Sequence, residues 1–421
     1  MIGRCAMGEQ SGPARTSCRI CDTPLPEPFL DLGPMPLANA FLATPEEGRQ
    51  EPVYPLAVAA CPRCGLVQLT FVVPAEQLYR HYLYVSSTSE AVCRYAADLA
   101  TRLVAQYHLG PSDLVLELGS NDGLVLREFQ RLGVAVLGVE PARNIAAVAN
   151  AHGVPTVEEF FSSQTAERLA REGKVATVIL GRHVFAHLDD LRDFFTAVDR
   201  LLANEGVVLI EVPYLGTLID GLEFDTIYHE HLSYLALQPM QVVCARHGFA
   251  VVDVESVPLH GGSVLFAIQR AGRSRSASER VERLASQEQR SRLTAADTLR
   301  RFADRVRAWQ QQFEGCLRQL DRSGAGLVGY GAAAKANTLL NFCPSAARRL
   351  RYILDRSPYK HGRYTPGTHL PVVDATAWDG DGATHIVILA WNFKDEIMSQ
   401  MQPFAKRGGR FVIPIPQPEV V

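Results

Sequence analysis

Apolar and polar positions divide this chain into two regions in which strands alternate with helices. An amphipathic pattern at 90–110 predicts a helix that leads into the first region. Apolar runs of strand length then occur at 114–118, 136–140, 175–180, 206–212, 249–254 and 263–268. Strands that alternate with helical segments are typical of a doubly wound, mostly parallel α/β sheet with right-handed crossovers.

The second region follows a stretch of different character. Residues 271–322 are rich in Arg, Glu, Gln and Ala with leucines at helical spacing, which predicts one or two connecting helices, mostly solvated. A Rossmann-like α/β unit then begins at 326–331. Its later strands are expected at 351–355, 385–390 and 410–414.

Length and charge narrow the class of protein. A chain of 421 residues exceeds what one core usually supports, and we expect domains at 1–80, 81–270 and 271–421. A net charge of -3 gives no field that would attract nucleic acid or an anionic membrane. Because there is neither a signal-peptide pattern nor a run of eighteen apolar residues, we expect a cytoplasmic enzyme of a small substrate, as a monomer or small homo-oligomer.

Four cysteines form two CxxC pairs, Cys18 with Cys21 and Cys61 with Cys64. Two such turns can deliver four thiolates to one tetrahedral ion, so a structural zinc is expected in a module looser than a compact zinc ribbon. A redox or incidental pairing is the alternative. The other five cysteines have no nearby partner and are expected to be inert: Cys5, Cys93, Cys244, Cys316 and Cys343.

A glycine loop after the strand at 114–118 indicates a cofactor site. Its pattern, Glu117-x-Gly119-x-Asn121-x-Gly123, has Asn121 where a dinucleotide fingerprint has its second glycine, so no pyrophosphate is expected. The carboxylate of Glu117 at the strand end, beside this wide glycine turn, suits a ligand that carries a cationic amino group next to an adenosyl ribose. These features favour S-adenosylmethionine.

Three further residues extend that interpretation. Glu140 ends the next strand and has the usual spacing for a carboxylate that accepts both ribose hydroxyls; a solvent-facing acid is the alternative. Phe161 and Ser162 follow the third strand, at the adenine edge, and could equally belong to the core.

The run Tyr228-His229-Glu230-His231 concentrates groups that exchange protons near neutral pH. A metal pair would need a third ligand, and a polar loop with locally satisfied histidines is the structural alternative. His187 follows the fourth strand at the same carboxyl edge of the sheet, so the two clusters are expected to converge.

Tyr82, in the link between the first two domains, could donate to a developing oxyanion or could simply pack. In the second α/β unit, Gly331 and Lys335 form another glycine turn before a helix. With Lys360, that helix N-terminus could receive a diphosphate; a loop that only packs is the alternative.

Together these residues resemble the S-adenosylmethionine-dependent C-methyltransferases that act on nucleotide-linked keto-deoxysugars in antibiotic sugar pathways. The resemblance covers nearly the whole chain, in the stretches 18–21, 29–33, 61–65, 116–123, 184–187, 224–231, 329–335 and 366–369. It implies a zinc-binding N-terminal module, a class I methyltransferase domain and a C-terminal Rossmann-like domain that helps to hold the nucleotide.

The resemblance also implies residue roles. His231 would remove the proton next to the keto group of a 4-keto-deoxysugar, with methylation at C-3 favoured and a dTDP-type nucleotide. The sugar pocket would include Tyr82, His187, Tyr228 and Glu230, and the nucleotide sugar would be held by Tyr330, Lys335, Asn337 and Lys360. Two departures from the family pattern are His183, where asparagine is common, and Ala336, where glycine is common.

Two other functions remain open at this stage. Two Rossmann-like units also fit an NAD-dependent nucleotide-sugar oxidoreductase or epimerase, which would bind NADH and not S-adenosylhomocysteine. A zinc-ribbon nucleic-acid binder with an appended methyltransferase fold is a third reading, although the chain lacks a basic stripe.

Overall fold

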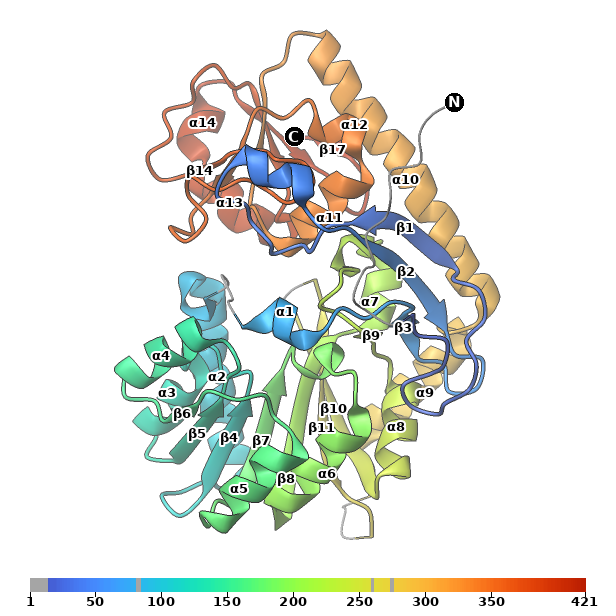
Figure 1. Cartoon of the computed structure of the whole chain (residues 1–421), viewed down its shortest axis with the longest axis vertical. Coiled ribbons are helices and arrows are strands. Elements are labelled where there is room, and N and C mark those ends of the chain that lie inside the picture. The colour runs from blue at the N-terminus through green and yellow to red at the C-terminus, as the bar shows by residue number, and fades with distance from the viewer. Residues whose placement is uncertain (1–13, 81–84, 259–260, 273–275) are drawn as a thin grey trace.

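The computed structural model describes residues 14–80, 85–258, 261–272 and 276–421. Figure 1 shows two α/β domains, one above the other, and an N-terminal module that lies along one side of both. The elements of the N-terminal module and its link are β1 (Leu30–Met35), η1 (Pro45–Gln50), β2 (Tyr54–Ala60), β3 (Val67–Leu69), α1 (Ala75–Tyr79) and η2 (Ser86–Thr88).

The central domain is a seven-stranded sheet in the order β10-β11-β8-β7-β4-β5-β6, in which β11 is antiparallel to both of its neighbours. Its elements are α2 (Glu90–Tyr107), β4 (Leu114–Leu118), α3 (Leu124–Arg131), β5 (Ala135–Val139), α4 (Arg143–Ala151), β6 (Thr156–Val157), α5 (Ser163–Arg171), β7 (Ala176–Arg182), η3 (Phe185–His187), α6 (Leu191–Leu201), β8 (Leu202–Pro213), α7 (Leu215–Asp220), η4 (Phe224–Thr226), β9 (Ser233–Tyr234), α8 (Leu237–Arg246), β10 (Phe249–Val257) and β11 (Ser263–Arg270). Helices cover both faces of this sheet, and its central strands are therefore almost continuously apolar.

The C-terminal domain has six strands in the order β14-β13-β12-β15-β16-β17, all parallel except β17. Its elements, with the helices that precede it, are α9 (Glu279–Ser291), α10 (Ala296–Arg322), β12 (Leu327–Tyr330), α11 (Ala334–Phe342), α12 (Pro344–Ala347), β13 (Ile353–Asp355), β14 (Val372–Asp374), β15 (His385–Ile388), η5 (Trp391–Phe393), α13 (Lys394–Gln400), α14 (Gln402–Lys406), β16 (Arg410–Ile413) and β17 (Glu419–Val420). The predicted alternation of strands and helices is confirmed in both domains.

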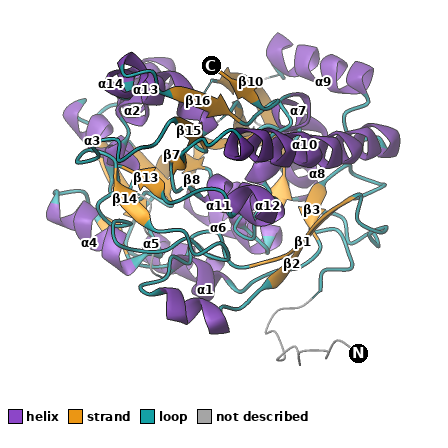
Figure 2. Ribbon diagram, turned by 90° about the horizontal axis from the view of Figure 1, so that it is seen from above, coloured by secondary structure: helices purple, strands orange, loops and turns teal. Residues whose placement is uncertain are grey.

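Helix α10 is less solvated than its composition predicts. Its buried stripe includes Phe302, Trp309 and Phe313, which join one hydrophobic core shared by the N-terminal module and the C-terminal domain. The Trp309 indole donates a hydrogen bond to the Pro414 carbonyl over 2.7 Å. Figure 2 shows α10 running across the molecule beside α12. The helix therefore fixes the C-terminal domain to the rest of the chain.

The N-terminal module does not fold as a separate sheet. Its three strands are completed by β9, which comes from the central domain directly after the histidine run, in the order β1-β2-β3-β9. The zinc module and the candidate catalytic loop consequently share backbone hydrogen bonds.

Candidate active site

The four cysteines of the two CxxC pairs converge as predicted. All four are buried and their sulfur atoms lie within 4.8 Å of one another. The turn after each pair is left-handed, at Asp22 (φ 59°) and Gly65 (φ 77°), and the Ile20 amide donates to the Cys18 sulfur over 3.4 Å. Thiolates about 2.3 Å from one tetrahedral ion would be roughly 3.8 Å apart. These dimensions fit a structural zinc.

The carboxyl edges of the two sheets face each other across a cavity of about 530 Å³. On one side it is lined by the strand ends at Glu117, Glu140 and Arg182, and on the other by Ala333 and Asp355 of the C-terminal domain. Ligands of α/β sheets bind at this edge, so the cavity is the candidate active site.

The glycine loop forms the floor of the cavity on the central-domain side. Gly119 has φ 59°, and a Cβ there would come within 2.4 Å of Val184, so only glycine allows this close approach. Gly123 (φ 75°) is the N-cap of α3 and is not among the residues that line the cavity. The Asn121 side chain accepts from the Ser86 amide over 2.9 Å, which closes the loop over the domain link.

Two buried carboxylates face this loop. Burial raises the pKa of Glu117 to about 8 against the opposing charge of Arg182, and the Glu117 Oε2 atom has no hydrogen-bond partner among the described residues. The two oxygens of Glu140 accept from the amides of Asn121 and Ala142, each over 2.9 Å. A cationic amino group would satisfy Glu117, and Glu140 is held where ribose hydroxyls can reach it. The site thus fits S-adenosylmethionine.

Phe161 and Ser162 differ in their surroundings. The Phe161 ring lines the cavity and packs edge-on against Phe194, with centroids 5.9 Å apart. The Ser162 hydroxyl accepts from the Thr165 amide and is the N-cap of α5, and the residue does not line the cavity.

A buried glutamate, Glu211, supports the cofactor edge from behind. Its carboxylate accepts from the Tyr95 hydroxyl (2.6 Å) and lies 3.4 Å from Arg182 and 3.1 Å from His183. Although burial opposes ionisation, Arg182 holds the pKa of Glu211 below its usual range. The residue that departs from the family pattern, His183, is thus paired with an anion and lines the cavity.

His231 has a defined proton arrangement. Its Nδ1 lies 2.8 Å from the Thr226 carbonyl, which can only accept, so Nδ1 carries the hydrogen. Its Nε2 therefore bears the lone pair, and the Tyr228 hydroxyl donates to it over 2.9 Å. Burial, with a smaller contribution from His187, lowers the pKa of His231 well below its usual range. The imidazole is neutral at pH 7, and both His231 and Tyr228 line the cavity.

His187 lies against His231, as the sequence predicts. The rings stack with centroids 5.2 Å apart at 27°, and Tyr79 stacks on the other face of His187 at 5.4 Å. Burial lowers the pKa of His187 to about 3, and its Nε2 has no hydrogen-bond partner in the described part of the chain. Both histidines line the cavity.

The two middle residues of the run point elsewhere. Glu230 accepts from the Asn39 side chain (2.6 Å), and His229 Nε2 donates to the Tyr54 and Pro55 carbonyls (3.3 and 3.2 Å). Neither lines the cavity. Tyr82 lies outside the described residues.

Two lysines of the C-terminal domain line the cavity. Lys335 is in the first turn of α11, and its ammonium lies over the Trp391 ring, 4.6 Å from the centroid. The Lys360 ammonium donates to the Ala332 carbonyl (2.7 Å) and lies 3.8 Å from Asp355, so it also supports the β12–α11 turn.

Tyr330 and Asn337 are structural in this arrangement. The Tyr330 hydroxyl donates to Gln400 (3.0 Å), and the Asn337 side chain donates to the Ala38 carbonyl (2.7 Å) and is fully buried. Neither lines the cavity.

Sequence reasoning missed several lining residues. Arg356 and Ser357 follow β13 and line the cavity, and Asn39 reaches it from the N-terminal module. The position of Arg356 and Ser357 directly after a parallel strand could have indicated them. Nothing near Asn39 in the sequence distinguishes it.

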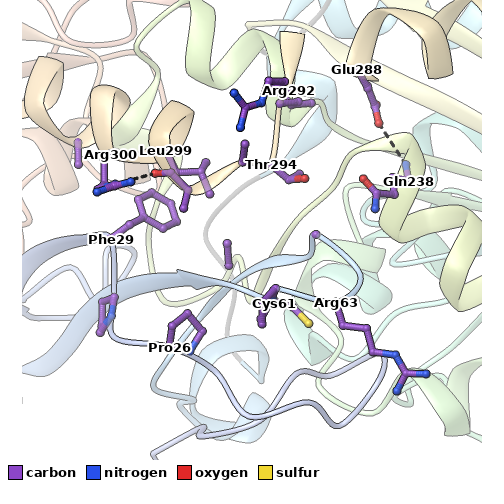
Figure 3. A pocket seen from close by; sticks show the side chains of 18 of the residues that line it. Pro26, Phe29, Cys61, Arg63, Gln238, Glu288, Arg292, Thr294, Leu299 and Arg300 are labelled. Carbon is purple, nitrogen blue, oxygen red and sulfur yellow. Dashed lines mark hydrogen bonds between the residues drawn. The ribbon is translucent and has the colours of Figure 1, made fainter. Parts of the chain in front are cut away.

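A larger cavity, of about 1140 Å³, lies between the zinc module and the helices α8 to α10. Figure 3 shows it lined by Phe29, Arg63, Arg292 and Leu299, with the Glu288 carboxylate accepting from the Gln238 amide. It contains neither the glycine loop nor the histidines, so it is not the candidate active site.

Comparisons with known proteins agree with this geometry. Residues 18–79 match a zinc-binding domain family, residues 79–254 a methyltransferase domain, and residues 258–416 the C-methyltransferase C-terminal domain. The C-methyltransferase NovU of Streptomyces niveus is 34% identical over 407 residues, which are 96% of each chain. The chain belongs to the C-methyltransferase family.

More distant similarities involve part of the C-methyltransferase chain. A ubiquinone biosynthesis O-methyltransferase of Bartonella quintana is 25% identical over 33% of this chain and 61% of its own. The solved structure of PH0226 from Pyrococcus horikoshii OT3 is 15% identical over 47% of this chain and 98% of its own, with a TM-score of 0.36.

Several expectations are therefore confirmed. The protein is an S-adenosylmethionine-dependent C-methyltransferase with a class I fold and a structural zinc site at its N-terminus. Among the described residues no helix combines the length and apolar character that a membrane span requires.

Proposed function

We propose that this enzyme methylates the carbon next to the keto group of a nucleotide-linked 4-keto-deoxysugar, with C-3 favoured. The observation that carries the proposal is the hydrogen-bonded Tyr228–His231 pair, which lines a cavity shared by the cofactor loop and the C-terminal domain. The domain division at 1–80, 81–270 and 271–421 accompanies this proposal, since the third domain would hold the nucleotide.

Methylation at carbon needs more than binding. A carbon becomes nucleophilic only when it loses a proton, so the site needs a base, and the adjacent carbonyl needs a donor when it takes the negative charge. Methylation at oxygen or nitrogen requires no enolate. A neutral imidazole next to a phenol supplies both groups.

In the proposed reaction His231 Nε2 takes the proton from the carbon, and the C–H electron pair becomes that of the enolate. The Tyr228 hydroxyl, released from Nε2, donates to the enolate oxygen, and Thr226 stabilises the imidazolium through Nδ1. S-adenosylmethionine, when bound at Glu117 and Glu140, supplies the electrophilic methyl group. The stacked rings of His187 and Tyr79 exclude water beside the base.

The nucleotide would bind on the opposite side of the cavity. Lys335 supplies a positive charge in the first turn of α11, and Arg356 supplies a second after β13. Two cations near a helix N-terminus suit a diphosphate. We favour a dTDP-type substrate, in a monomeric or small homo-oligomeric cytoplasmic enzyme.

Replacement of the base tests this function. His231→Asn should lower methyl transfer to a dTDP-4-keto-deoxysugar by about 10² to 10⁴-fold, because general base catalysis contributes that much. Binding of S-adenosylhomocysteine should be unchanged. The matched control is His229→Asn, two residues away in the same run but directed at Tyr54 and Pro55. Wild-type turnover in His231→Asn would refute the assignment.

A further inference from the structure

Arg19 connects the zinc module to both histidine-bearing loops. It lies within the first CxxC turn, between Cys18 and Cys21, and its side chain has no exposed area. Its Nε donates to the Asp189 carboxylate over 3.0 Å, and its Nη1 donates to the Leu232 carbonyl over 2.9 Å. Buried guanidinium groups persist only with such partners.

The two acceptors lie close in sequence to the two stacked histidines. Leu232 directly follows His231, and Asp189 lies two residues after His187. The ring centroids of these histidines are 5.2 Å apart. A planar guanidinium with five donors can hold a carboxylate and a carbonyl at once, which a lysine ammonium on a flexible stem does less well.

The main chain of Arg19 is itself fixed to the zinc turn. Its amide donates to the Gln68 side chain (2.9 Å), which in turn donates to the Ser17 carbonyl (3.2 Å). The next amide, of Ile20, donates to the Cys18 sulfur. The position of the guanidinium is therefore set by the turn that holds the metal ligands.

We propose that Arg19 is a positioning residue that holds His187 and His231 at their working separation, so that the zinc module sets the geometry of proton abstraction. The expected effect of Arg19 on turnover rests on the proposed function. Displacement of catalytic groups by an ångström can lower turnover by about 10²-fold. The loop that carries the base belongs to the central domain, and the N-terminal zinc module supplies this support from another part of the chain.

The test compares Arg19→Met with Arg15→Met. Arg15 is the matched control because it pairs with the same Asp189 oxygen at 3.2 Å, yet its side chain is 28% exposed and its Nε donates to the Ser17 carbonyl instead of to the loop that carries the base. In Arg19→Met we expect kcat to fall on the order of 10²-fold with little change in KM. Zinc content by metal analysis and the Kd for S-adenosylhomocysteine should match wild type, and Arg15→Met should keep wild-type kcat.

A second readout needs no substrate. In protein labelled with ¹³C-histidine, the His231 signal should titrate nearer its ordinary pKa in Arg19→Met, because water enters as the rings separate. The charged groups that face His231, namely His187, His183 and Lys335, are unchanged in this variant. If Arg19→Met does not fold, Asp189→Asn decides the question, because it alters only one of the acceptors of Arg19. It should shift kcat and the His231 titration in the same directions as Arg19→Met.

Wild-type kcat and wild-type histidine titration in the folded Arg19 or Asp189 variant would overturn the proposal. If the wild-type enzyme turns over no keto sugar while the histidine signal still shifts, the proposed function fails and the positioning role stands. A fall in zinc content that accounts for the whole loss of kcat would also overturn it.

Discussion

A backbone carbonyl decides which nitrogen of His231 can act as a base. Because the Thr226 carbonyl occupies Nδ1, only Nε2 has a lone pair, and Tyr228 lies 2.9 Å from it. Low-dielectric surroundings keep the imidazole neutral, so the base form is present at physiological pH. Residue type alone could not distinguish this nitrogen from the three others in the run.

Tyr228→Phe tests the donor of this pair. We expect kcat to fall on the order of ten- to a hundredfold, because a hydrogen bond to a group that becomes charged contributes roughly 1.5 to 3 kcal/mol. Binding of S-adenosylhomocysteine should not change. Tyr359→Phe, at an exposed position, serves as the control. Unchanged steady-state kinetics in Tyr228→Phe would remove the tyrosine from the mechanism.

Glu117 predicts a pH dependence of cofactor binding. Its pKa of about 8 means that the free protein carries a largely protonated carboxyl at pH 7, whereas a cationic ligand favours the ionised form. Affinity for S-adenosylhomocysteine, measured by calorimetry, should therefore rise as pH increases through about 8. In Glu117→Gln this part of the dependence should disappear. The same slope in both proteins would contradict the role.

At the scale of single residues, the sequence predicted which side chains carry the chemistry better than it predicted which residues they contact. His187 and Glu117 were recognisable from residue type and from their positions at strand ends, because parallel strands bring such ends together. His231 was recognisable from the residue types of its run alone. The partners of the base loop, Arg19 and Asn39, lie about two hundred residues away in sequence. Contacts over that distance have no local pattern that could predict them.

At the scale of elements, the segment that carries His231 belongs to two domains. It is a loop of the methyltransferase domain, and it continues into β9, which is a strand in the sheet of the zinc module. β9 pairs with β3, and the Leu69 amide donates to the Leu232 carbonyl over 3.0 Å. The His229 side chain donates to the backbone of β2. The two-residue strand β9 is too short to produce a period in the sequence, so it was not predicted.

Buried neutral histidines on these elements predict acid sensitivity. Burial lowers the pKa of His187 to about 3 and that of His229 to about 4, so below pH 6.5 the unfolded chain binds protons that the folded chain does not. Stability should fall as pH decreases from about 6.5, by roughly 1.4 kcal/mol per pH unit for each histidine. Urea unfolding between pH 7 and 5 measures this. His229→Gln should flatten the dependence; an equal slope would contradict it.

At the scale of the molecule, the cavity exists because the carboxyl edges of two sheets face each other. The sequence predicted both sheets, since their strands are apolar and spaced for crossovers. It could not predict their mutual orientation, which depends on the shared core of α10 and on contacts such as Trp309 with Pro414. Only seven of the twenty-seven residues of α10 are buried. The polar majority dominates the composition, which is why the composition suggested a solvated helix.

Loss of the metal should affect stability and turnover together. In Cys61→Ser we expect loss of bound zinc, a lower unfolding temperature and loss of methyl transfer, because β9 and Arg19 depend on the zinc module. Thermal unfolding and metal analysis measure the outcome. Cys316→Ala, outside the cluster, is the control. A zinc-free variant with wild-type kcat would separate the module from the active site.

Proton abstraction by His231 is the central claim, and it can be measured without methyl transfer. The enzyme with S-adenosylhomocysteine and a dTDP-4-keto-deoxysugar in D₂O should exchange the proton next to the keto group, followed by NMR. Exchange should persist in His229→Asn and fall to the uncatalysed rate in His231→Asn. Exchange at the wild-type rate in His231→Asn would contradict the account.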